Sequence, residues 1–230
     1  MSNRPVLQYP DPKLRRKASL VDFEQDDVEQ IVRDLIDTLE VQSGAGLAAT
    51  QIDCTKRAVV IDPSAFDAEN PDPLPGREKF WALINPSFTL SKETEKWTEA
   101  CLSVAGFKGT VERSRTCELK YWTFDGVEKS LTVDWPLSGA LQHECDHLDG
   151  VLYIDRLSSF SRHSIVKKIK KRARIAKQEA ERAREEEILD LYGPAALREH
   201  RKQKKAGTLK KRKPRVKVKK NFGKTKKKRK

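Results

Sequence analysis

The chain has 230 residues, of which 35% are charged and 37% hydrophobic, and its formal net charge is +13. This length fits one domain of roughly 100–200 residues plus an extension. No stretch approaches the roughly 18 consecutive apolar residues of a membrane-spanning helix, and the N-terminal residues lack the apolar segment of a signal peptide. The composition therefore argues against a membrane protein and against a secreted one.

The chain has four cysteines, and we expect them to lie in the reducing cytoplasm. Because we expect a cytoplasmic protein, we expect its thiols to be free or bound to a metal, and not paired in disulfides.

The charge is unevenly spread: the segment 156–230 holds 30 of the 47 Lys and Arg residues but only 7 of the 34 Asp and Glu residues. An acidic body therefore precedes a basic tail, and such a tail favours nucleic acid or an anionic membrane surface as a partner.

The first predicted element is an amphipathic helix over residues 23–40, where apolar residues recur at helical spacing. Two short β-branched or apolar runs then predict strands at 57–62 and 81–86, the second closed by Pro86. Between them, residues 62–76 are rich in Pro, Asp and Asn and predict a surface loop.

The second half of the body predicts strands and one helix. Residues 93–99 and 109–111 have weak strand patterns, whereas 116–123 and 128–135 alternate around Asp125-Gly126 and predict a hairpin. A helix follows at 137–148, with Gly150 in a C-cap-like position. We therefore expect an α+β fold with mainly antiparallel strands around a central helix.

The C-terminal part has a different composition. Spaced apolar residues and alanines predict a helix from 158 to about 191, and Gly193-Pro194 should break it. Residues 202–230 are lysine-rich and of low complexity, and we expect them to be disordered in isolation. The predicted organisation is a folded body at 1–160, a basic helical extension at 161–192 and a lysine-rich tail at 193–230.

The strongest chemical signal is the segment His143-Glu144-Cys145-Asp146-His147, an HExxH pattern on the predicted helix at 137–148. Residues four apart differ by about 40° around a helix, so both imidazoles project from one face and can bind one divalent metal. Glu144 lies beside that face, where it can hold a water and move its proton. The alternative is a helix that carries two histidines by chance.

Two further segments complete a candidate site. Cys101, in the segment EACLS at 99–103, is a candidate third ligand, although a lone cysteine is usually a small buried hydrophobic residue. The segment GAGLAATQ at 44–51 has glycines that permit close approach to a ligand, and Gln51 can donate a hydrogen bond to an oxyanion. The alternative for this segment is a Gly-rich turn.

Together the segments 44–51, 99–103 and 142–150 resemble, in order and spacing, the three signature motifs of the peptide deformylases. The resemblance covers roughly residues 5–160. It implies a metal held by Cys101, His143 and His147 with water in the fourth place, and Glu144 as general base and then general acid. The family removes the N-formyl group from nascent chains that begin with formyl-methionine and releases formate.

The resemblance also implies four residues that contact substrate. The Gln51 side-chain amide and the Leu102 backbone N–H would stabilise the developing oxyanion, Gly46 would pair its backbone with the peptide, and Ala45 would lie near the methionine pocket. The chain departs from the family pattern at Ala100 and Ala105, where Gly and Pro are usual, and at Ala45, where a bulkier aliphatic residue is common. These departures should affect substrate preference and leave the metal ligands intact.

One thiolate with two imidazoles suits Fe²⁺, and also Zn²⁺, Ni²⁺ or Co²⁺ as substitutes. Family members similar to this chain generally use Fe²⁺. We expect a monomer that acts on N-formylmethionyl nascent peptides and does not bind a membrane. The tail has almost no aromatic residues, so neutralisation of phosphates, and not base stacking, would dominate its binding to nucleic acid. We expect the tail to bind ribosomal RNA and so to hold the enzyme near its substrate. The alternative is a solvated tail that only aids solubility.

Two other functions compete with this interpretation. An HExxH metalloprotease usually completes its zinc shell with a downstream His or Glu, whereas here the upstream Cys101 does so in a matching motif. A non-enzymatic ribosome-binding module with a relic metal site would have no reason to keep Glu144, Gln51 and Cys101 together. The metal content and turnover of a formylated dipeptide distinguish these possibilities.

Overall fold

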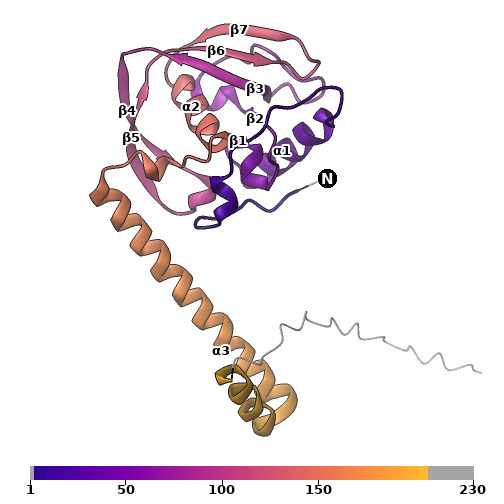
Figure 1. Cartoon of the computed structure of the whole chain (residues 1–230), viewed down its shortest axis with the longest axis vertical. Coiled ribbons are helices and arrows are strands. Elements are labelled where there is room, and N and C mark those ends of the chain that lie inside the picture. Colours follow the sequence, from indigo (N-terminus) through magenta and orange to yellow (C-terminus); the bar gives the residue numbers. More distant parts are fainter. Residues whose placement is uncertain (1–2, 207–230) are drawn as a thin grey trace, which may run out of the picture. The chain divides into compact units, whose positions relative to one another are not determined.

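The N-terminal unit is built on a five-stranded antiparallel sheet and a separate two-stranded hairpin (Figure 1). The computed structural model describes residues 3–206, and the chain divides into two units at 1–168 and 169–230. The large sheet has the strand order β1-β2-β3-β6-β7. Its strands are β1 (Gly46–Ala48), β2 (Ala58–Ile61), β3 (Trp81–Leu90), β6 (Cys117–Trp122) and β7 (Glu128–Val133). The hairpin consists of β4 (Thr94–Ala100) and β5 (Lys108–Ser114).

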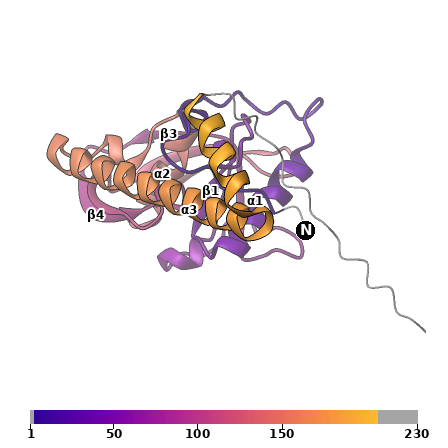
Figure 2. The same ribbon diagram turned by 90° about the horizontal axis from the view of Figure 1, so that it is seen from below.

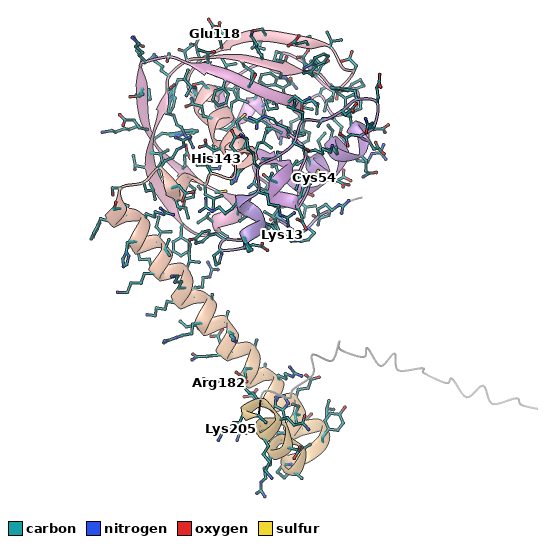
Figure 3. All side chains as sticks on the ribbon, in the orientation of Figure 1. Lys13, Cys54, Glu118, His143, Arg182 and Lys205 are labelled. Carbon is teal, nitrogen blue, oxygen red and sulfur yellow. The ribbon has the colours of Figure 1, made fainter. Side chains whose placement is uncertain are left out.

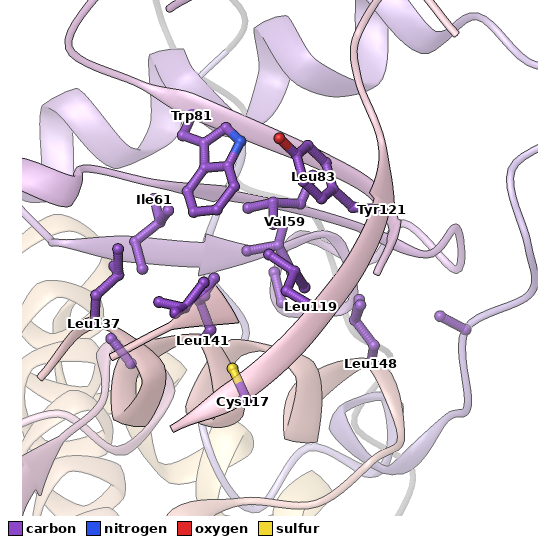
Figure 4. Packing of buried hydrophobic residues seen from close by; sticks show 14 residues of the cluster. Val59, Ile61, Trp81, Leu83, Cys117, Leu119, Tyr121, Leu137, Leu141 and Leu148 are labelled. Carbon is purple, nitrogen blue, oxygen red and sulfur yellow. The ribbon is translucent and has the colours of Figure 1, made fainter. Parts of the chain in front are cut away.

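Helices α1 (Val28–Gln42) and α2 (Leu137–Leu148) cover opposite faces of the large sheet. Along β2, Val59 and Ile61 pack in the cluster that contains α2, whereas Ala58 and Val60 pack in the cluster that contains α1. Successive strand residues point to opposite faces, so each helix takes one face. Because both faces are covered, β2 is apolar throughout and does not alternate. Figure 4 shows the cluster on the α2 side.

Helix α2 lies inside the unit, between the β4–β5 hairpin and α1 in both views (Figure 1 and Figure 2). It contacts β1, β2 and β5. All twelve of its residues are buried. The chain leaves α2 through Gly150, which has a φ of +73°, and an added Cβ there would lie 2.6 Å from the Arg15 carbonyl oxygen. A glycine is therefore required at this turn.

The antiparallel α+β prediction is confirmed, and several predicted elements match closely. The helix at 137–148 has the expected bounds, and the β6–β7 hairpin turns at Asp125-Gly126. Helix α1 begins later than predicted, because Asp27 caps it by accepting a hydrogen bond from the Gln30 backbone N–H. The short 3₁₀ segments are Pro12–Arg15, Ala49–Ile52, Pro63–Phe66, Leu102–Val104 and Tyr153–Asp155.

The prediction that Pro86 closes its strand is wrong. Strand β3 continues to Leu90, and its register against β6 shifts between Ile84 and Ser87. Asn85 has a φ of +50° at this irregularity. A bulge of this kind accommodates a proline, which has no backbone N–H to donate to the ladder.

The C-terminal unit consists of helical chain in the residues that the structure describes. Helix α3 (Ser159–Lys205) has a kink at Gly193, whose φ is 75° and ψ is 179°, next to Pro194. The predicted break lies there, and a second helical segment follows it to Lys205. The expectation that residues 202–206 are disordered in isolation stays a prediction. Salt bridges join the two segments, from Arg201 to Glu185 and from Lys204 to Glu181. The expectation for 207–230 falls outside the described residues.

Among residues 3–206, no helix combines the length and the apolar character that crossing a membrane requires.

Candidate metal centre

Three side chains from two parts of the sequence place possible metal ligands close together. His143 and His147 lie four residues apart on α2, and Cys101 follows β4 directly. One ligand atom from each of the three lies within 4.8 Å of the other two. The Cys101 Sγ is 3.2 Å from His147 Nε2. All three residues are buried, so a cation bound here would be largely withdrawn from solvent.

A buried carboxylate fixes the orientation of the first histidine. His143 Nδ1 lies 2.6 Å from Glu99 Oε2, so the N–H on Nδ1 points to the carboxylate and Nε2 is left for a metal. Arg113 in turn holds Glu99, with Nε 2.7 Å from Oε1 and an Nη 3.1 Å from Oε2. Burial alone would raise the pKa of Glu99, but hydrogen bonds from His143 and Arg113 outweigh burial and hold the pKa at about 2. Glu99 is therefore a carboxylate at neutral pH.

The same arginine connects the site to the far end of the motif helix. Arg113 also donates to Asp146 Oδ2 at 2.6 Å, and Arg156 donates to both oxygens of Asp146 at 2.5 Å. The side chain of Arg113 is only 1% exposed. Moving α2 away from β5 would separate Arg113 from Asp146 and leave buried charge uncompensated, which is costly. The arginine therefore fixes the position of α2 against β5.

The electrostatics of the two histidines differ, and both fit a cation site. Burial lowers the pKa of His147 well below its usual value, so its imidazole is neutral, the form that binds metals. Burial opposes a charge on His143 too, but hydrogen bonds to Cys101 and Glu99 raise its pKa well above the usual value. Anionic groups that favour an imidazolium also favour a divalent metal in the same place. A thiolate with two imidazoles is a common donor set for such ions.

Glu144 lies beside this cluster with an unused oxygen. Its Oε2 is buried and has no hydrogen-bond partner among residues 3–206, and the same is true of His147 Nδ1. Burial raises the pKa of Glu144 to about 7. Its other oxygen packs against Gly46, where an added Cβ would lie only 2.7 Å from Oε1. Gly46 therefore leaves the space that the Glu144 carboxyl occupies.

The side-chain amide of Gln51 has a fixed orientation. Its Oε1 accepts a hydrogen bond from the Ala48 backbone N–H at 2.9 Å, so the NH₂ group points the other way. There Nε2 lies 3.7 Å from Cys101 Sγ and 3.1 Å from Ser103 Oγ. Gln51 is only 2% exposed. Its donor is thus held beside the candidate ligand Cys101.

A cavity of about 910 Å³ brings most of the predicted site residues together. Those that line it are Ala45, Gly46, Gln51, Cys101, Leu102, His143 and Glu144. His147 joins them through the ligand cluster. Ala100 and Ala105, the two departures beside the cysteine motif, also line this cavity. Its remaining walls are largely apolar and include Ile61, Phe66, Trp97 and Ala140.

Sequence analysis missed the residues that support the ligands. Glu99 belongs to the EACLS segment, and its place two residues before Cys101 on a strand was the only available signal. Arg113 and Trp97 lie in strands with weak patterns and carry no signal of their own. The remaining cysteines are free, and burial raises the pKa of both Cys117 and Cys145, to about 11 for Cys117. These two thiols are therefore protonated members of the core.

Figure 3 shows His143 on α2, surrounded by side chains of the N-terminal unit. The polypeptide deformylase family model matches residues 3–163. The peptide deformylase of Polynucleobacter necessarius is 41% identical over 170 residues, covering 74% of this chain and 94% of that protein. That of Stutzerimonas stutzeri is 40% identical over 167 residues, covering 72% and 94%.

Solved structures agree with the sequence relatives. A peptide deformylase from Legionella pneumophila has a TM-score of 0.66 at 30% identity and covers 76% of this chain and 98% of its own. A Met-Ala-Ser-bound class I type b peptide deformylase from Acinetobacter baumannii has a TM-score of 0.59 at 26% identity, covering 68% and 100%. The matched region 3–163 contains every residue of the ligand cluster and of the cavity. This chain therefore belongs to the polypeptide deformylase family.

Proposed function

We propose that the chain hydrolyses the N-formyl group of formyl-methionine at the start of nascent polypeptides and releases formate. The observation that carries this proposal is the convergence of the Cys101, His143 and His147 ligand atoms within 4.8 Å. A buried carboxylate with an unused oxygen, Glu144, lies on the same cavity. The reaction consumes one water, breaks the formyl C–N bond and leaves a free amine.

Cys101, His143 and His147 would hold the metal. When bound, a divalent metal supplies Lewis acidity that polarises the formyl oxygen and lowers the pKa of water. Fe²⁺ is the proposed native ion, with Zn²⁺, Ni²⁺ or Co²⁺ as substitutes, because all of them accept thiolate and imidazole ligands. The hydrogen bond between Glu99 and His143 would orient the imidazole and raise its basicity.

Glu144 would act first as general base and then as general acid. A proton carrier is most effective when its pKa is near the working pH, and burial raises the pKa of Glu144 to about 7. Its Oε2, which has no partner among residues 3–206, is the atom that would take a proton from water. The same oxygen would return that proton to the leaving amine nitrogen.

Gln51 and Leu102 would stabilise the negative charge that develops on the formyl oxygen. The Gln51 amide is fixed in advance by its bond to the Ala48 backbone, so its donor needs no reorganisation during the reaction. The Leu102 backbone N–H would be the second donor. Gly46 would pair its backbone with the peptide, and Ala45 would lie near the pocket for the methionine side chain.

The proposed substrate is a linear peptide that begins with formyl-methionine. The relative from Acinetobacter baumannii has been solved with Met-Ala-Ser bound. A peptide of this kind fits a cavity of about 910 Å³ whose walls combine apolar side chains with a small number of polar groups.

The regions beyond the matched segment suggest where the enzyme works. We propose a cytoplasmic monomer with a catalytic segment at 1–160, a basic helical extension at 161–192 and a lysine-rich tail at 193–230. The extension and tail would bind ribosomal RNA by neutralising phosphates and so concentrate the enzyme near emerging chains. The charge of segment 156–230, with 30 basic and 7 acidic residues, supports this proposal.

Formate release tests the proposed activity. The full chain, loaded anaerobically with Fe²⁺, should release formate from formyl-Met-Ala-Ser and should leave acetyl-Met-Ala-Ser intact. Chelation should abolish release, and added Fe²⁺ should restore it. A protein that holds one metal but releases no formate from any formylated peptide would contradict the proposal.

A further inference from the structure

The N-terminal residues 4–9, which we call the N-terminal strap, join the two loops that carry the proposed oxyanion donors. The Leu7 backbone N–H donates to the Gln51 carbonyl oxygen at 2.8 Å, and the Tyr9 backbone N–H donates to the Ser103 carbonyl oxygen at 2.8 Å. The two acceptors lie in separate 3₁₀ segments and are 52 residues apart in the sequence. One short piece of backbone therefore connects both loops.

The Gln8 side chain makes a third connection between the strap and the loops. Its Nε2 donates to the Leu102 carbonyl oxygen at 2.8 Å, and it lies 3.4 Å from the Val6 carbonyl oxygen within the strap. Gln8 is exposed and lines the main cavity, so this bond is made beside the cavity and not in the core. Its acceptor belongs to Leu102, the residue whose backbone N–H is the second proposed oxyanion donor.

The turn at Leu102 is restrained at each neighbouring peptide group. The Val104 backbone N–H donates to the Cys101 carbonyl oxygen at 3.0 Å, and the Ser103 backbone N–H donates to Cys101 Sγ at 3.4 Å. The carbonyl groups of Leu102 and Ser103 accept from Gln8 and from the strap backbone. The Leu102 N–H is the first of its 3₁₀ segment, so it has no partner within that segment and can serve a ligand.

The strap is itself anchored on helix α1. Arg4 Nε donates to Asp34 Oδ2 at 2.8 Å, and the Arg4 backbone N–H donates to Thr38 Oγ1 at 3.0 Å. Both partners are buried residues of α1. In the first of the two loops, Thr50 Oγ1 donates to the His147 carbonyl oxygen at 2.9 Å, which ties that loop to α2. The strap therefore rests on a fixed element, and its bonds restrain the loops.

Two donors stabilise one oxyanion only when both lie within hydrogen-bond distance of the same atom. Donors that are fixed in advance need no rearrangement during the reaction, and a displacement of about 1 Å can cost about 100-fold in rate. Gln51 and Leu102 belong to different loops, so their separation depends on whatever joins these loops. The N-terminal strap bonds to the backbone of both.

Resting on the proposed function, we infer that the N-terminal strap sets the separation of the two oxyanion donors, and that Gln8 is the positioning residue that holds the Leu102 peptide in place. Gln8 acts through Leu102 on an interaction that strengthens in the transition state. Its loss should therefore lower kcat and leave KM and metal content unchanged. Removing one hydrogen bond of this kind should lower kcat by about 2- to 10-fold.

Turnover by the full, Fe²⁺-loaded chain tests this inference. Gln8→Met keeps the length of the side chain but removes its donor, so kcat on formyl-Met-Ala-Ser should fall by the stated factor at unchanged KM. Gln42→Met is the matched control, because Gln42 is also an exposed glutamine that lines the cavity. It should keep the wild-type kcat. An unchanged kcat in Gln8→Met, a raised KM alone, or equal losses in the two variants overturns the inference.

Ligand binding tests the same donor without catalysis. A hydroxamate peptide presents an anionic oxygen to a bound metal, whereas the product Met-Ala-Ser does not. In calorimetry on the metal-loaded chain, Gln8→Met should lower the affinity for the hydroxamate, relative to Met-Ala-Ser, by about 2- to 10-fold. A ratio equal to that of the wild type overturns the inference. A lowered ratio in a chain that releases no formate leaves the inference standing and contradicts the proposed function.

Hydrogen exchange on the wild-type chain covers the case in which Gln8→Met does not fold. The backbone N–H groups of Leu7 and Tyr9 should exchange far more slowly than those of an unstructured peptide, because both are bonded to the loops. Exchange at the rate of an unstructured peptide would mean that the strap opens freely and cannot fix the loops, and this result overturns the inference.

Discussion

Helix α2 carries the two histidines of the candidate metal centre and helix α3 carries many basic residues, and the two helices differ sharply in burial. Every residue of α2 is buried, including His143, Glu144 and His147. Of the 47 residues of α3, only Ile165 is buried. Most polar side chains buried in α2 have partners: His143 bonds to Glu99, and Asp146 accepts from Arg113. Ser138 and Gln142 donate to backbone carbonyls. Among residues 3–206, Glu144 Oε2 and His147 Nδ1 have no such partner, and both lie at the candidate metal centre. The side chains of α3 face water and are constrained mainly by charge. Specific chemistry therefore lies in α2, whereas α3 offers only a long-range field.

The largest effect should come from Glu144, the proposed proton carrier on α2. Glu144→Gln preserves the shape of the side chain but removes its basicity, so kcat should fall by about 10²- to 10⁴-fold. The metal content should stay at the wild-type level, since Gln at 144 leaves the three ligands in place. Turnover numbers together with metal analysis check both points. A variant with wild-type kcat would remove Glu144 from the mechanism.

Gln51 should have the next largest effect. Replacing an oxyanion donor usually lowers kcat by about 10²- to 10³-fold, and we expect Gln51→Leu to fall in this range. Gln42→Leu is the matched control, because Gln42 lines the same cavity but is exposed. Its kcat should be close to the wild-type value. Equal effects of the two substitutions would mean that the fixed Gln51 amide has no special role.

Glu99 should act on the metal more than on the chemistry. Glu99→Gln removes the charge that orients His143, and loss of such a support typically lowers metal affinity about 10- to 100-fold. Competition with a chromophoric chelator would measure it. Glu95→Gln, on the same strand and in an exposed ion pair with Arg115, should leave metal affinity unchanged. An unaltered affinity in Glu99→Gln would show that His143 needs no such support.

The smallest effect on turnover should come from the basic extension. A chain truncated after Lys168, at the boundary of the N-terminal unit, should keep its kcat on free formyl-Met-Ala-Ser. We expect the full chain to co-sediment with ribosomes at low salt, through phosphate contacts that weaken steeply with salt, and the truncated chain to lose this binding. Retained ribosome binding after truncation would locate the contact in the catalytic segment instead.

The two helices also differ in how far sequence predicted them. Helix α2 has its predicted bounds, and the motifs at 44–51 and 99–103 line the same cavity as its His143 and Glu144. A motif specifies residue types that must meet, so its parts can be placed in space before a structure is known. For α3, composition predicted a helix and a break at Gly193 but missed the helical segment after it. The ion pairs of that segment with Glu185 and Glu181 join residues 16 and 23 positions apart, respectively.

Other features depended on contacts that no local pattern encodes. Strand β3 passes Pro86 because β6 provides a partner beyond the bulge. Arg113 joins Glu99, 14 residues before it, to Asp146, 33 residues after it. The Trp97 indole lies against Gly139 only because the β4–β5 hairpin packs on α2. These contacts arise from tertiary packing, and local sequence preference has little influence on them.

An anaerobic Fe²⁺ titration of the metal-free full chain tests the central claim most directly. Bound metal and formate release from formyl-Met-Ala-Ser would be followed in the same samples. We predict that both saturate at one Fe²⁺ per chain and that His147→Ala loses both. Formate release from metal-free protein, or one bound Fe²⁺ per chain in His147→Ala with wild-type turnover, would contradict the assignment of this cluster as the catalytic metal site.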